Sequence, residues 1–466
     1  MSKDAVTLST SNLDLGLLPH GHILHSLIAR PEGKDDKQSS DLLIGFSNVD
    51  DHHHSVARTF VNCLVGRYAN RLPSGETKLE SGAKLHLPGA NGVCLHGGET
   101  GFDTLPWTPL ARNDSALFPL SDEQHGAPPP ASDPDAPVSE ASSLHRIYSP
   151  AGADGFPCSL VVEVLTVVLA PKEEKTEIEG ERKGKSLGKV KVVMRAKIRE
   201  DGDEGIDKGT PINLTMHWGF RLDDHKDDNA LNHRLYLASD HLVALDDLGL
   251  ATGKVDKIEK GGEMDFFSTG LDAEHVTIGE RYPKDGIDRN FLFNTPPPSL
   301  TDPTGSARLA SQPQAVLTSP APSSSTAYSG PVYSLRFASN QPSVQVYTAP
   351  SLDGSGPARK AAHGGPSYDA ESAVPQGESD RAAENAKQKR GYGKDGAVFL
   401  EFHAPVGTVT KAKSAVGGEQ TELGQWMEEW AEGRKAREEG RTWEVDTVLK
   451  KGEVYENWTE VEVVVL

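Results

Sequence analysis

Apolar and polar residues alternate along residues 212–222, which read INLTMHWGFRL. The apolar positions are Ile212, Leu214, Met216, Trp218, Phe220 and Leu222. A period of two residues is typical of a β-strand with one face packed on a core, so the opposite face would present His217. The alternative is that His217 is an ordinary hydrogen-bonded strand histidine, because a single histidine is weak evidence of catalysis.

Short strand-like segments of the same kind recur along the chain and are separated by polar turns. They lie at residues 13–18, 23–28, 41–49, 144–148, 159–169, 190–198, 234–238, 332–338, 344–349, 397–403 and 460–466. The pattern predicts one clear helix, at residues 423–440, whose alternating acidic and basic residues indicate an exposed face. Many short strands with almost no helix favour an all-β fold, a large antiparallel β-sandwich.

The composition indicates that long insertions separate some of these strands. Only 36% of the 466 residues are hydrophobic, and the residues that dilute them are bunched in a few segments. These segments lie near residues 110–143, 171–189, 295–330, 351–395 and 411–445. We therefore expect a single domain over residues 1–466 whose core is interrupted by long solvated loops.

Charge and cysteine content limit the partners and the compartment. The net charge is −20, which repels nucleic acid and anionic membranes, and we expect neither as a partner. No segment has the pattern of a signal peptide or a membrane span, and the cysteines Cys63, Cys94 and Cys158 are not spaced as metal ligands. We therefore expect a cytoplasmic protein, a monomer or weak dimer, with no metal at the DDHHHS run of residues 50–55 or elsewhere.

Ionisable residues next to strand-like sequence are the candidates for chemistry. Glu401 lies in the middle of AVFLEFH, where its neighbours should be buried, and a buried carboxylate needs a partner. The alternatives for Glu401 are a paired structural acid or a residue on a solvated edge strand. Other candidates are Asn70 and Arg71 in GRYANRL, His96 beside two glycines, and Asp288 ahead of an aromatic strand.

Taken in order, these segments resemble the aldose 1-epimerase, or galactose mutarotase, family. The matching motifs are GRYANR at 66–71, LHGGETGFD at 95–103 with Trp107, TPINLTMH at 210–217, DRNF at 288–291, PSVQVYT at 342–348 and LE at 400–401. One such motif is weak evidence, but the ordered set is specific.

The resemblance implies a β-supersandwich that interconverts the α and β anomers of a free aldohexose such as glucose or galactose, without a cofactor. By position, Glu401 would be the general base and His217 the general acid. The residues matching sugar-binding positions are Asn70, Arg71, His96, Asp288 and Gln345. Met216, Arg289 and His403 depart from the residues usual in the family, so the resemblance does not fix sugar preference or efficiency.

The physical chemistry fits these roles, because mutarotation needs a base and an acid acting on two oxygens of one ring. We expect a carboxylate near His217 to raise its pKa toward neutrality, and we expect a bell-shaped pH dependence of the rate. An apolar platform for a sugar face would come from Phe102, Trp107, Tyr68 or Phe291, and the alternative for each is plain core.

Other functions remain open on the sequence. A hexose-6-phosphate 1-epimerase would need a cationic pocket, for which Arg67, Arg289 and Arg221 are the candidates. A non-catalytic sugar-binding or sensing protein would keep the pocket without needing both Glu401 and His217. An interaction scaffold would use the insertions, and deletion of residues 351–395 would then remove function.

Overall fold

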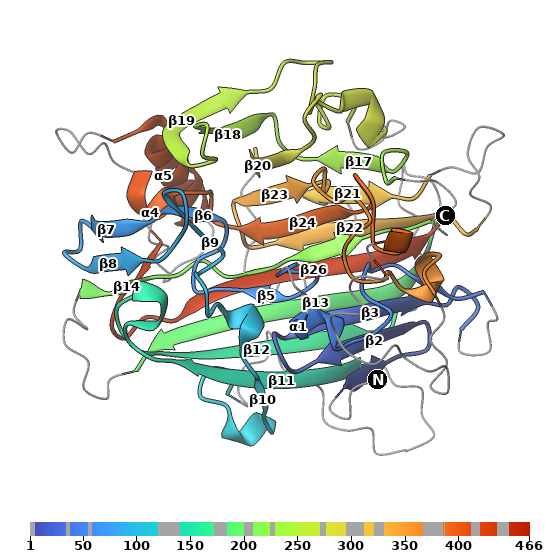
Figure 1. The fold of residues 1–466 in the computed structure, drawn as a ribbon, viewed down its shortest axis with the longest axis horizontal. Coiled ribbons are helices and arrows are strands. Elements are labelled where there is room, and N and C mark those ends of the chain that lie inside the picture. Colours follow the sequence, from blue (N-terminus) through green and yellow to red (C-terminus); the bar gives the residue numbers. More distant parts are fainter. Residues whose placement is uncertain are drawn as a thin grey trace.

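The fold consists of two layers of antiparallel strands (Figure 1). The computed structural model describes residues 5–33, 38–54, 58–119, 140–171, 184–199, 208–223, 229–270, 276–294, 312–320, 330–366, 385, 387–411, 420–435 and 447–466. The prediction of an antiparallel all-β sandwich is confirmed. No helix among these residues has the length and apolar character needed to cross a membrane.

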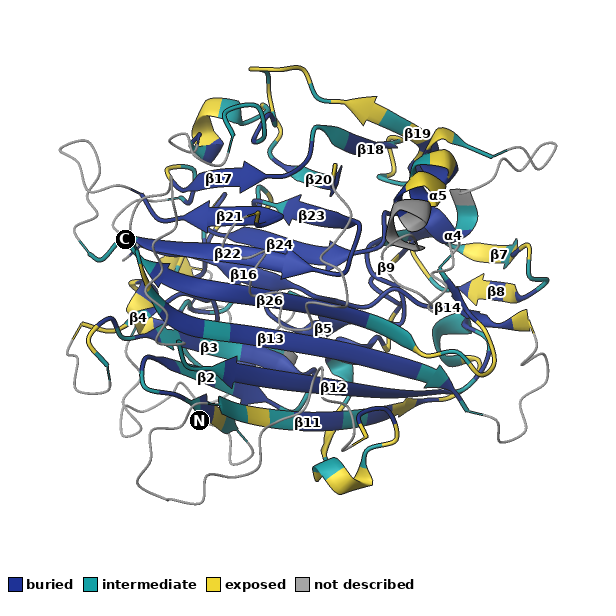
Figure 2. Cartoon of the chain, turned by 180° about the vertical axis from the view of Figure 1, so that it is seen from behind, coloured by how far each residue is buried: buried dark blue, intermediate teal, exposed yellow. Residues whose placement is uncertain are grey.

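The first layer is an eight-stranded sheet. In spatial order its strands are β10 (Thr108–Pro109), β11 (Glu140–Ser149), β12 (Leu160–Leu169), β13 (Lys185–Ile198), β26 (Tyr455–Val465), β22 (Tyr333–Ser339), β21 (Ala315–Thr318) and β17 (Arg234–Leu237). Seen from behind, its central strands are almost entirely buried (Figure 2). The nearly continuous apolar run of β12 is the sequence signal of such two-sided burial, whereas β26 also buries the acidic residues Glu460 and Glu462.

The second layer is built mainly from a six-stranded and a four-stranded sheet. The six-stranded sheet runs β16 (Trp218–Phe220), β24 (Val398–His403), β23 (Ser343–Tyr347), β20 (Asp288–Leu292), β18 (His241–Leu245) and β19 (Ala251–Lys257). The four-stranded sheet runs β1 (Val6–Ser9), β2 (Leu13–Leu18), β3 (Ile23–Ala29) and β4 (Ser40–Asp41).

Short strand pairs and helices complete the described structure. The pairs are β5 (Leu64–Val65) with β15 (Thr215–Met216), β6 (Arg71–Pro73) with β9 (Val93–Leu95), β7 (Gly75–Lys78) with β8 (Lys84–Leu87), and β14 (Thr210–Pro211) with β25 (Val448–Leu449). The helices are α1 (Asp51–His54), α4 (Thr408–Lys411) and α5 (Glu422–Lys435), with short 3-10 turns at Phe102–Thr104, Arg112–Asp114, Ala153–Gly155, Ile278–Arg281 and Ala361–His363.

The main core lies between the two layers and sets the direction of the site. Trp218 on β16 and Leu400 and Phe402 on β24 belong to this core. Because side chains alternate across a strand, Glu401 on β24 points away from the core, to the other face of the six-stranded sheet. The alternation read from the sequence therefore decides which face of the second layer carries the chemistry.

The segment 212–222 is not one continuous strand, as the alternation suggested. It contains two short strands, β15 and β16, which pair with different neighbours: β15 with β5, and β16 with β24. The polar positions are buried as well, and Asn213, Thr215 and Arg221 are fully covered. The expected half-buried strand is thus a fully buried segment, because its polar side chains bond to the backbone of residues 396–404.

Parts of the expected insertions belong to the folded body. Strand β21 lies inside the 295–330 segment and pairs with β17 and β22 in the eight-stranded sheet. Residues 185–189 are already part of β13. The backbone of residues 116 and 117 donates to the buried Glu163 carboxylate, so the start of the 110–143 segment packs on the sheet. Assigning these residues to solvated loops was wrong, because Pro, Ser and charge frequency does not report single buried strands.

The other two insertions are also partly ordered. Residues 351–366 and 387–395 contribute buried side chains, among them Lys360, His363 and Tyr392. Helix α5 is described as far as Lys435, and its buried Leu423 packs beside the edge strand β19 and its neighbour β18. Residues 120–139, 172–183, 295–311, 321–329, 367–384, 412–419 and 436–446, where other insertion residues were expected, lie outside the described residues.

Candidate active site

A buried glutamate and a buried histidine meet on the face of the six-stranded sheet turned away from the core. The Nε2 atom of His217 lies 3.2 Å from Oε1 of Glu401, and their side chains are 7% and 2% exposed. His217 lies where the chain leaves β15 and enters β16, and Trp218 pairs with Leu400, next to Glu401. The sandwich thus brings together two residues that are far apart in the sequence.

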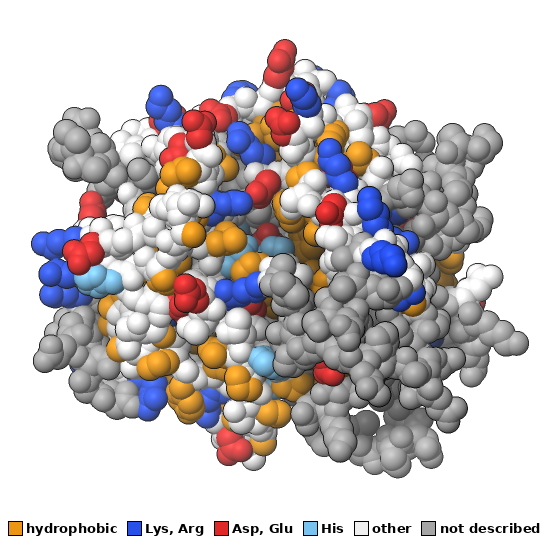
Figure 3. Space-filling model, viewed as in Figure 1, with side chains coloured by type: hydrophobic (Ala, Val, Ile, Leu, Met, Phe, Trp, Pro, Cys, Tyr) orange, Lys and Arg blue, Asp and Glu red, His pale blue; other side chains and the backbone are white. Residues whose placement is uncertain are grey.

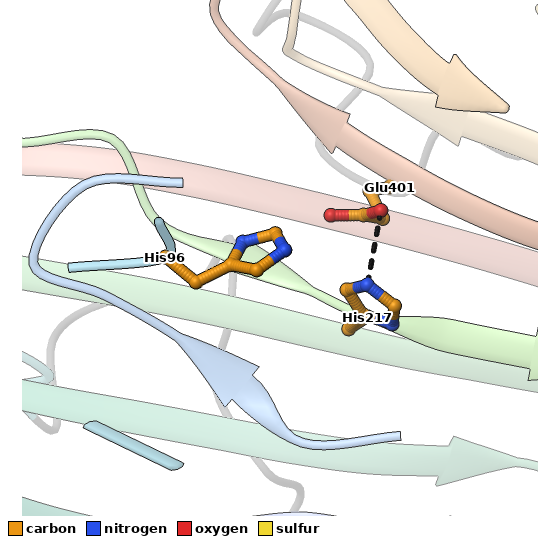
Figure 4. A group of neighbouring side chains, drawn as sticks. All are labelled: His96, His217 and Glu401. Carbon is orange, nitrogen blue, oxygen red and sulfur yellow. Dashed lines mark ion pairs between the residues drawn. The ribbon is translucent and has the colours of Figure 1, made fainter. Parts of the chain in front are cut away.

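His96 completes a three-residue cluster with this pair (Figure 4). Its ring lies edge-on to the ring of His217, with centroids 5.3 Å apart. The backbone N–H of Asn70 donates to Nδ1 of His96 at 3.2 Å, so in a neutral ring the proton is on Nε2. Asn70 has a left-handed backbone (φ 64°), and its side-chain oxygen accepts from the N–H of Arg71. In this structure Asn70 orients His96.

The remaining predicted binding residues form one connected group. Nη2 of Arg71 lies 3.1 Å from Oδ2 of Asp288, and Nε2 of Gln345 donates to Oδ1 of Asp288 at 2.6 Å. Gln345 pairs directly with Glu401 across β23 and β24. Arg71 and Asp288 are partly exposed, whereas Gln345 is buried. The predicted residues therefore run from a charged rim to a buried acid–base pair, and the space-filling view shows histidines inside a hollow on this face (Figure 3).

Burial favours the uncharged forms of the acid–base pair. Desolvation lowers the pKa of His217 to about 3. It raises the pKa of Glu401 well above its usual value, and Asp288 raises it further while Arg71 lowers it. The pKa of His96 is lowered by burial, by His217 and by Arg71. The expectation that a carboxylate would raise the pKa of His217 was wrong, because the loss of water on burial is the largest influence on this pKa and lowers it.

The site contains buried polar atoms that have no hydrogen-bond partner among the described residues. These are Nδ1 of His217, Oε2 of Glu401, Oε1 of Gln345, Nε2 of His403 and both side-chain polar atoms of Asn290. Asn290, Gln345 and Glu401 are consecutive partners across β20, β23 and β24, so they form one row. Buried polar groups are usually bonded, and a row of unbonded ones next to a hollow is suited to a ligand rich in hydroxyl groups.

Sequence reasoning missed the aromatic residue nearest the histidines. The ring of Phe60 lies 4.6 Å from the ring of His96 and 6.2 Å from that of His217. The guanidinium of Arg58 lies 4.5 Å from the centre of the Phe60 ring and donates a hydrogen bond to the carboxylate of Asp103. Phe60 precedes the first recognisable motif, and no periodic pattern marks it.

The aromatic residues named from the sequence as possible platforms are core residues. Phe102, Trp107 and Phe291 belong to the main core, and Tyr68 belongs to a second apolar cluster. Phe399 is instead the aromatic residue on the site face of β24, with its ring 4.8 Å from that of His217. The alternative reading of plain core was therefore correct for all the residues named.

The arginines considered for a phosphate pocket all serve elsewhere. Arg67 donates to the carbonyl oxygens of Pro157 and Cys158 and to the Ser149 hydroxyl. Arg221 is fully buried in an ion pair with Asp223. Arg289 lies 3.9 Å from Asp256, on the opposite strand face from Asp288. None of the three carries its charge into the site.

The departures from the family pattern also have defined places. Met216 is buried in the main core, as the alternation predicted. His403 lies on the same strand face as Glu401 and is fully buried, and its charged form would lower the pKa of both His217 and His96. His403 therefore belongs to the electrostatic environment of the pair.

The cluster of His96, His217 and Glu401 also has the composition of a metal site. Their potential ligand atoms lie within 4.8 Å of one another, and no other such group occurs among the described residues. His52 of the DDHHHS run contacts His25 instead, at 3.3 Å between ring nitrogens. The absence of a metal stays a prediction.

Comparisons with known proteins agree with the motifs. The profile of the aldose 1-epimerase family matches residues 187–375, which include His217, Asp288 and Gln345. Galactose mutarotase from Mus musculus is 25% identical over 257 residues, which is 55% of this chain and 58% of that protein. Aldose 1-epimerase from Escherichia coli is 24% identical over 261 residues, 55% of this chain and 59% of that protein. The chain thus spans just over half the length of these relatives.

Solved structures agree in fold. An aldose epimerase homologue from C. elegans superposes with a TM-score of 0.56 at 16% identity, covering 98% of each chain. Galactose 1-epimerase from Lactobacillus acidophilus gives a TM-score of 0.56 at 16% identity, covering 99% of this chain and 94% of that one. The motifs, the profile matched over residues 187–375, the relatives and the fold lead to one conclusion: the chain is similar to the proteins of the aldose 1-epimerase family.

Proposed function

We propose that the protein is an isomerase, an aldose 1-epimerase that interconverts the α and β anomers of a free aldohexose such as glucose or galactose. The observation that carries this proposal is the buried contact of 3.2 Å between His217 and Glu401. Beside it lies the row of unbonded polar atoms on Asn290, Gln345 and Glu401. A polyhydroxylated ring supplies the donors and acceptors that these atoms lack.

The chemistry follows from the proton that the pair shares. Burial raises the pKa of Glu401 and lowers that of His217, so the pair as a whole is uncharged over a wide pH range. Transfer of one proton across the contact converts it into a carboxylate and an imidazolium, which are a strong base and a strong acid. A buried pair of this kind is therefore ready for both proton transfers that mutarotation requires.

In the proposed reaction the Glu401 carboxylate takes the proton of the anomeric hydroxyl. The bond between the anomeric carbon and the ring oxygen breaks as the carbonyl forms, and the His217 imidazolium donates its proton to the ring oxygen. Rotation about the adjacent carbon–carbon bond presents the other carbonyl face, and the reverse steps close the ring. Arg71 and Asp288 would hold hydroxyls at the rim, and His96 would donate from Nε2.

The charges of the site favour an unphosphorylated sugar over a hexose 6-phosphate. The rim cation Arg71 is paired with Asp288, and Arg58 is paired with Asp103. A phosphate dianion would need cations without such carboxylate partners. The arginines named from the sequence for this purpose are bonded elsewhere in the fold.

Polarimetry on freshly dissolved α-D-glucose and α-D-galactose tests the proposal. The native protein should accelerate the approach to anomeric equilibrium, and Glu401→Gln and His217→Gln should each lower kcat by about 10²- to 10⁴-fold. The ratio of the rates for the two sugars would measure sugar preference.

Matched controls distinguish catalysis from the loss of a buried group. Glu460 is also a buried glutamate with a raised pKa, but it lies on the eight-stranded sheet and is paired with Lys189. Glu460→Gln should keep kcat, as should His145→Gln at another buried histidine. Equal loss in the variants and the controls, or no acceleration by the native protein with either sugar, would refute the proposal.

A further inference from the structure

His217 lies at an interruption in the sheet where its strand changes partners. Before it, Met216 pairs with Leu64 of β5, and after it Trp218 pairs with Leu400 of β24. A catalytic side chain at such a change of partner is held by fewer regular ladder bonds than a residue in mid-strand. Something other than the regular ladder must therefore fix the backbone of His217.

The chain segment that faces this interruption is 62–63. The N–H of His217 donates to the carbonyl of Cys63 at 2.9 Å, and the carbonyl of His217 accepts from the N–H of Asn62 at 3.0 Å. Both backbone groups of His217, its N–H and its carbonyl, are thus bonded to two consecutive residues of one neighbouring segment.

The side chain of Asn62 extends the same support beyond His217. Its Oδ1 accepts from the N–H of Gly219 at 2.7 Å, and its Nδ2 donates to the carbonyl of Ile44 at 2.6 Å. Ile44 in turn donates its own N–H to the carbonyl of Gly219 at 2.9 Å. The amide of Asn62 therefore replaces a backbone peptide between two segments that do not form a continuous ladder.

Asn62 is also fixed in place itself. It is 1% exposed, and its carbonyl accepts from the N–H of Leu24 at 3.0 Å. Its backbone is left-handed, with φ 55°, a conformation that asparagine tolerates better than most residues. Every polar group of Asn62 thus has a defined partner, and two of these bonds go to the residues 217 and 219.

We infer that Asn62 is a positioning residue for the acid–base pair, which it serves by holding the carbonyl of His217 and the N–H of Gly219. The inference rests on the proposed function, since it concerns the same His217 and Glu401. Asn62 does not touch the substrate in this account. It acts through the orientation of the His217 ring relative to the Glu401 carboxylate.

Two variants separate the side-chain bonds from the backbone conformation. Asn62→Gly keeps the left-handed backbone accessible and removes both side-chain bonds, whereas Asn62→Asp keeps the acceptor for Gly219 and loses the donor to Ile44. Asn91→Gly is the matched control, because Asn91 is exposed and has a similar φ of 57°.

Steady-state kinetics should show a loss in kcat rather than in KM. We expect Asn62→Gly to lower kcat by about tenfold to a hundredfold with KM changed less than about threefold, the scale for a small misplacement of a catalytic group. Asn62→Asp should fall between Asn62→Gly and the native protein. Asn91→Gly should match the native protein. A kcat for Asn62→Gly within about twofold of native, measured per folded molecule, would overturn the inference.

Histidine side-chain NMR tests the inference without relying on activity. The ¹⁵N shifts of the His217 ring, assigned with His217→Gln, report its contact with Glu401 even if the native protein does not accelerate mutarotation. We expect Asn62→Gly to move these shifts and leave those of the distant His145 unchanged. Unchanged His217 shifts in a folded Asn62→Gly variant would refute the positioning role, whereas inactivity of the native protein alone would refute only the proposed function.

Discussion

Two buried polar clusters in the second layer differ in one respect: whether their atoms are satisfied. In the cluster around Lys360, Nζ donates to Oδ2 of Asp41 at 2.7 Å, to the carbonyl of Leu43 and to that of His25. Oδ1 of Asp41 accepts from the N–H groups of Leu27 and Leu43. His363 lies 2.8 Å from the Tyr392 hydroxyl and 2.8 Å from the carbonyl of Asp41.

The cluster around Glu401 is buried to the same degree but lacks partners. Oε2 of Glu401 and Nδ1 of His217 have none among the described residues, and the same holds for Oε1 of Gln345. Fully bonded ionisable groups stabilise a fold, whereas unbonded ones cost stability and persist where a ligand or a reaction needs them. Burial and perturbed pKa values occur in both clusters, so hydrogen-bond satisfaction is what separates the two.

The largest expected effect is on stability, from breaking the satisfied cluster. Lys360→Met leaves the Asp41 carboxylate buried without its cation, and it should lower the free energy of unfolding by about 3–5 kcal/mol. Urea denaturation measures this loss, and kcat per folded molecule should stay unchanged. The double variant Asp41→Asn/Lys360→Met should recover part of the loss.

The control for Lys360→Met is Lys84→Met on β8, where the lysine is exposed and the change should be within about 0.5 kcal/mol. A similar loss of unfolding free energy in both variants would show that the ion pair of Lys360 does not stabilise the fold.

The Lys360 cluster also explains why deletion of residues 351–395 is a poor test for an interaction scaffold. That deletion removes Lys360 and His363 from the folded body.

The pH dependence of the rate should follow the shared proton of the catalytic pair. The pair holds one proton between the lowered pKa of His217, about 3, and the raised pKa of Glu401, so kcat/KM should be maximal in that window. It should fall about tenfold per pH unit outside each limit. A kcat/KM that does not fall on the alkaline side, at any pH at which the protein stays folded, would contradict the assignment. Because the Asp288 charge raises the pKa of Glu401, Asp288→Asn should move the alkaline limb to lower pH.

Acid should weaken the satisfied cluster through His363. Burial lowers the pKa of His363 to about 4 from 6.5, so its folded form prefers the neutral ring. The resulting stability is complete above pH 6.5 and is lost as the pH falls toward 4, at about 1.4 kcal/mol per pH unit. Free energies of unfolding at pH 7 and pH 5 should therefore differ less in His363→Gln than in the native protein. Equal differences would contradict the pKa of His363.

The smallest expected effect is at the aromatic wall of the site. Phe60→Ala removes the ring that packs on His96, and it should raise KM about threefold to tenfold through the loss of an apolar contact with the sugar face. Phe60→Tyr keeps the ring and serves as the control. If Phe60→Ala changed only the melting temperature, the ring would be a packing residue.

Much of the site was readable from motifs, because short motifs fix residue types at positions that touch a ligand. His217, Glu401, His96 and the Arg71, Asp288 and Gln345 group were all named from the sequence, and the structure brings them together. Of the residues missed, Phe60 and Asn62 lie outside the motifs, and Asn290 lies inside DRNF, where only Asp288 was named. Their importance comes from contacts with segments far away in the sequence.

The sequence by itself determined the all-β class and the two-residue alternation that turns Glu401 away from the core, because both depend on local periodicity. Only the tertiary structure decided the depth of burial. It lowered the pKa of His217 to about 3, opposite to the expectation, and it broke the 212–222 segment into separate strands. Desolvation and strand pairing both depend on residues that are far apart in the chain, so no local pattern in the sequence predicts them.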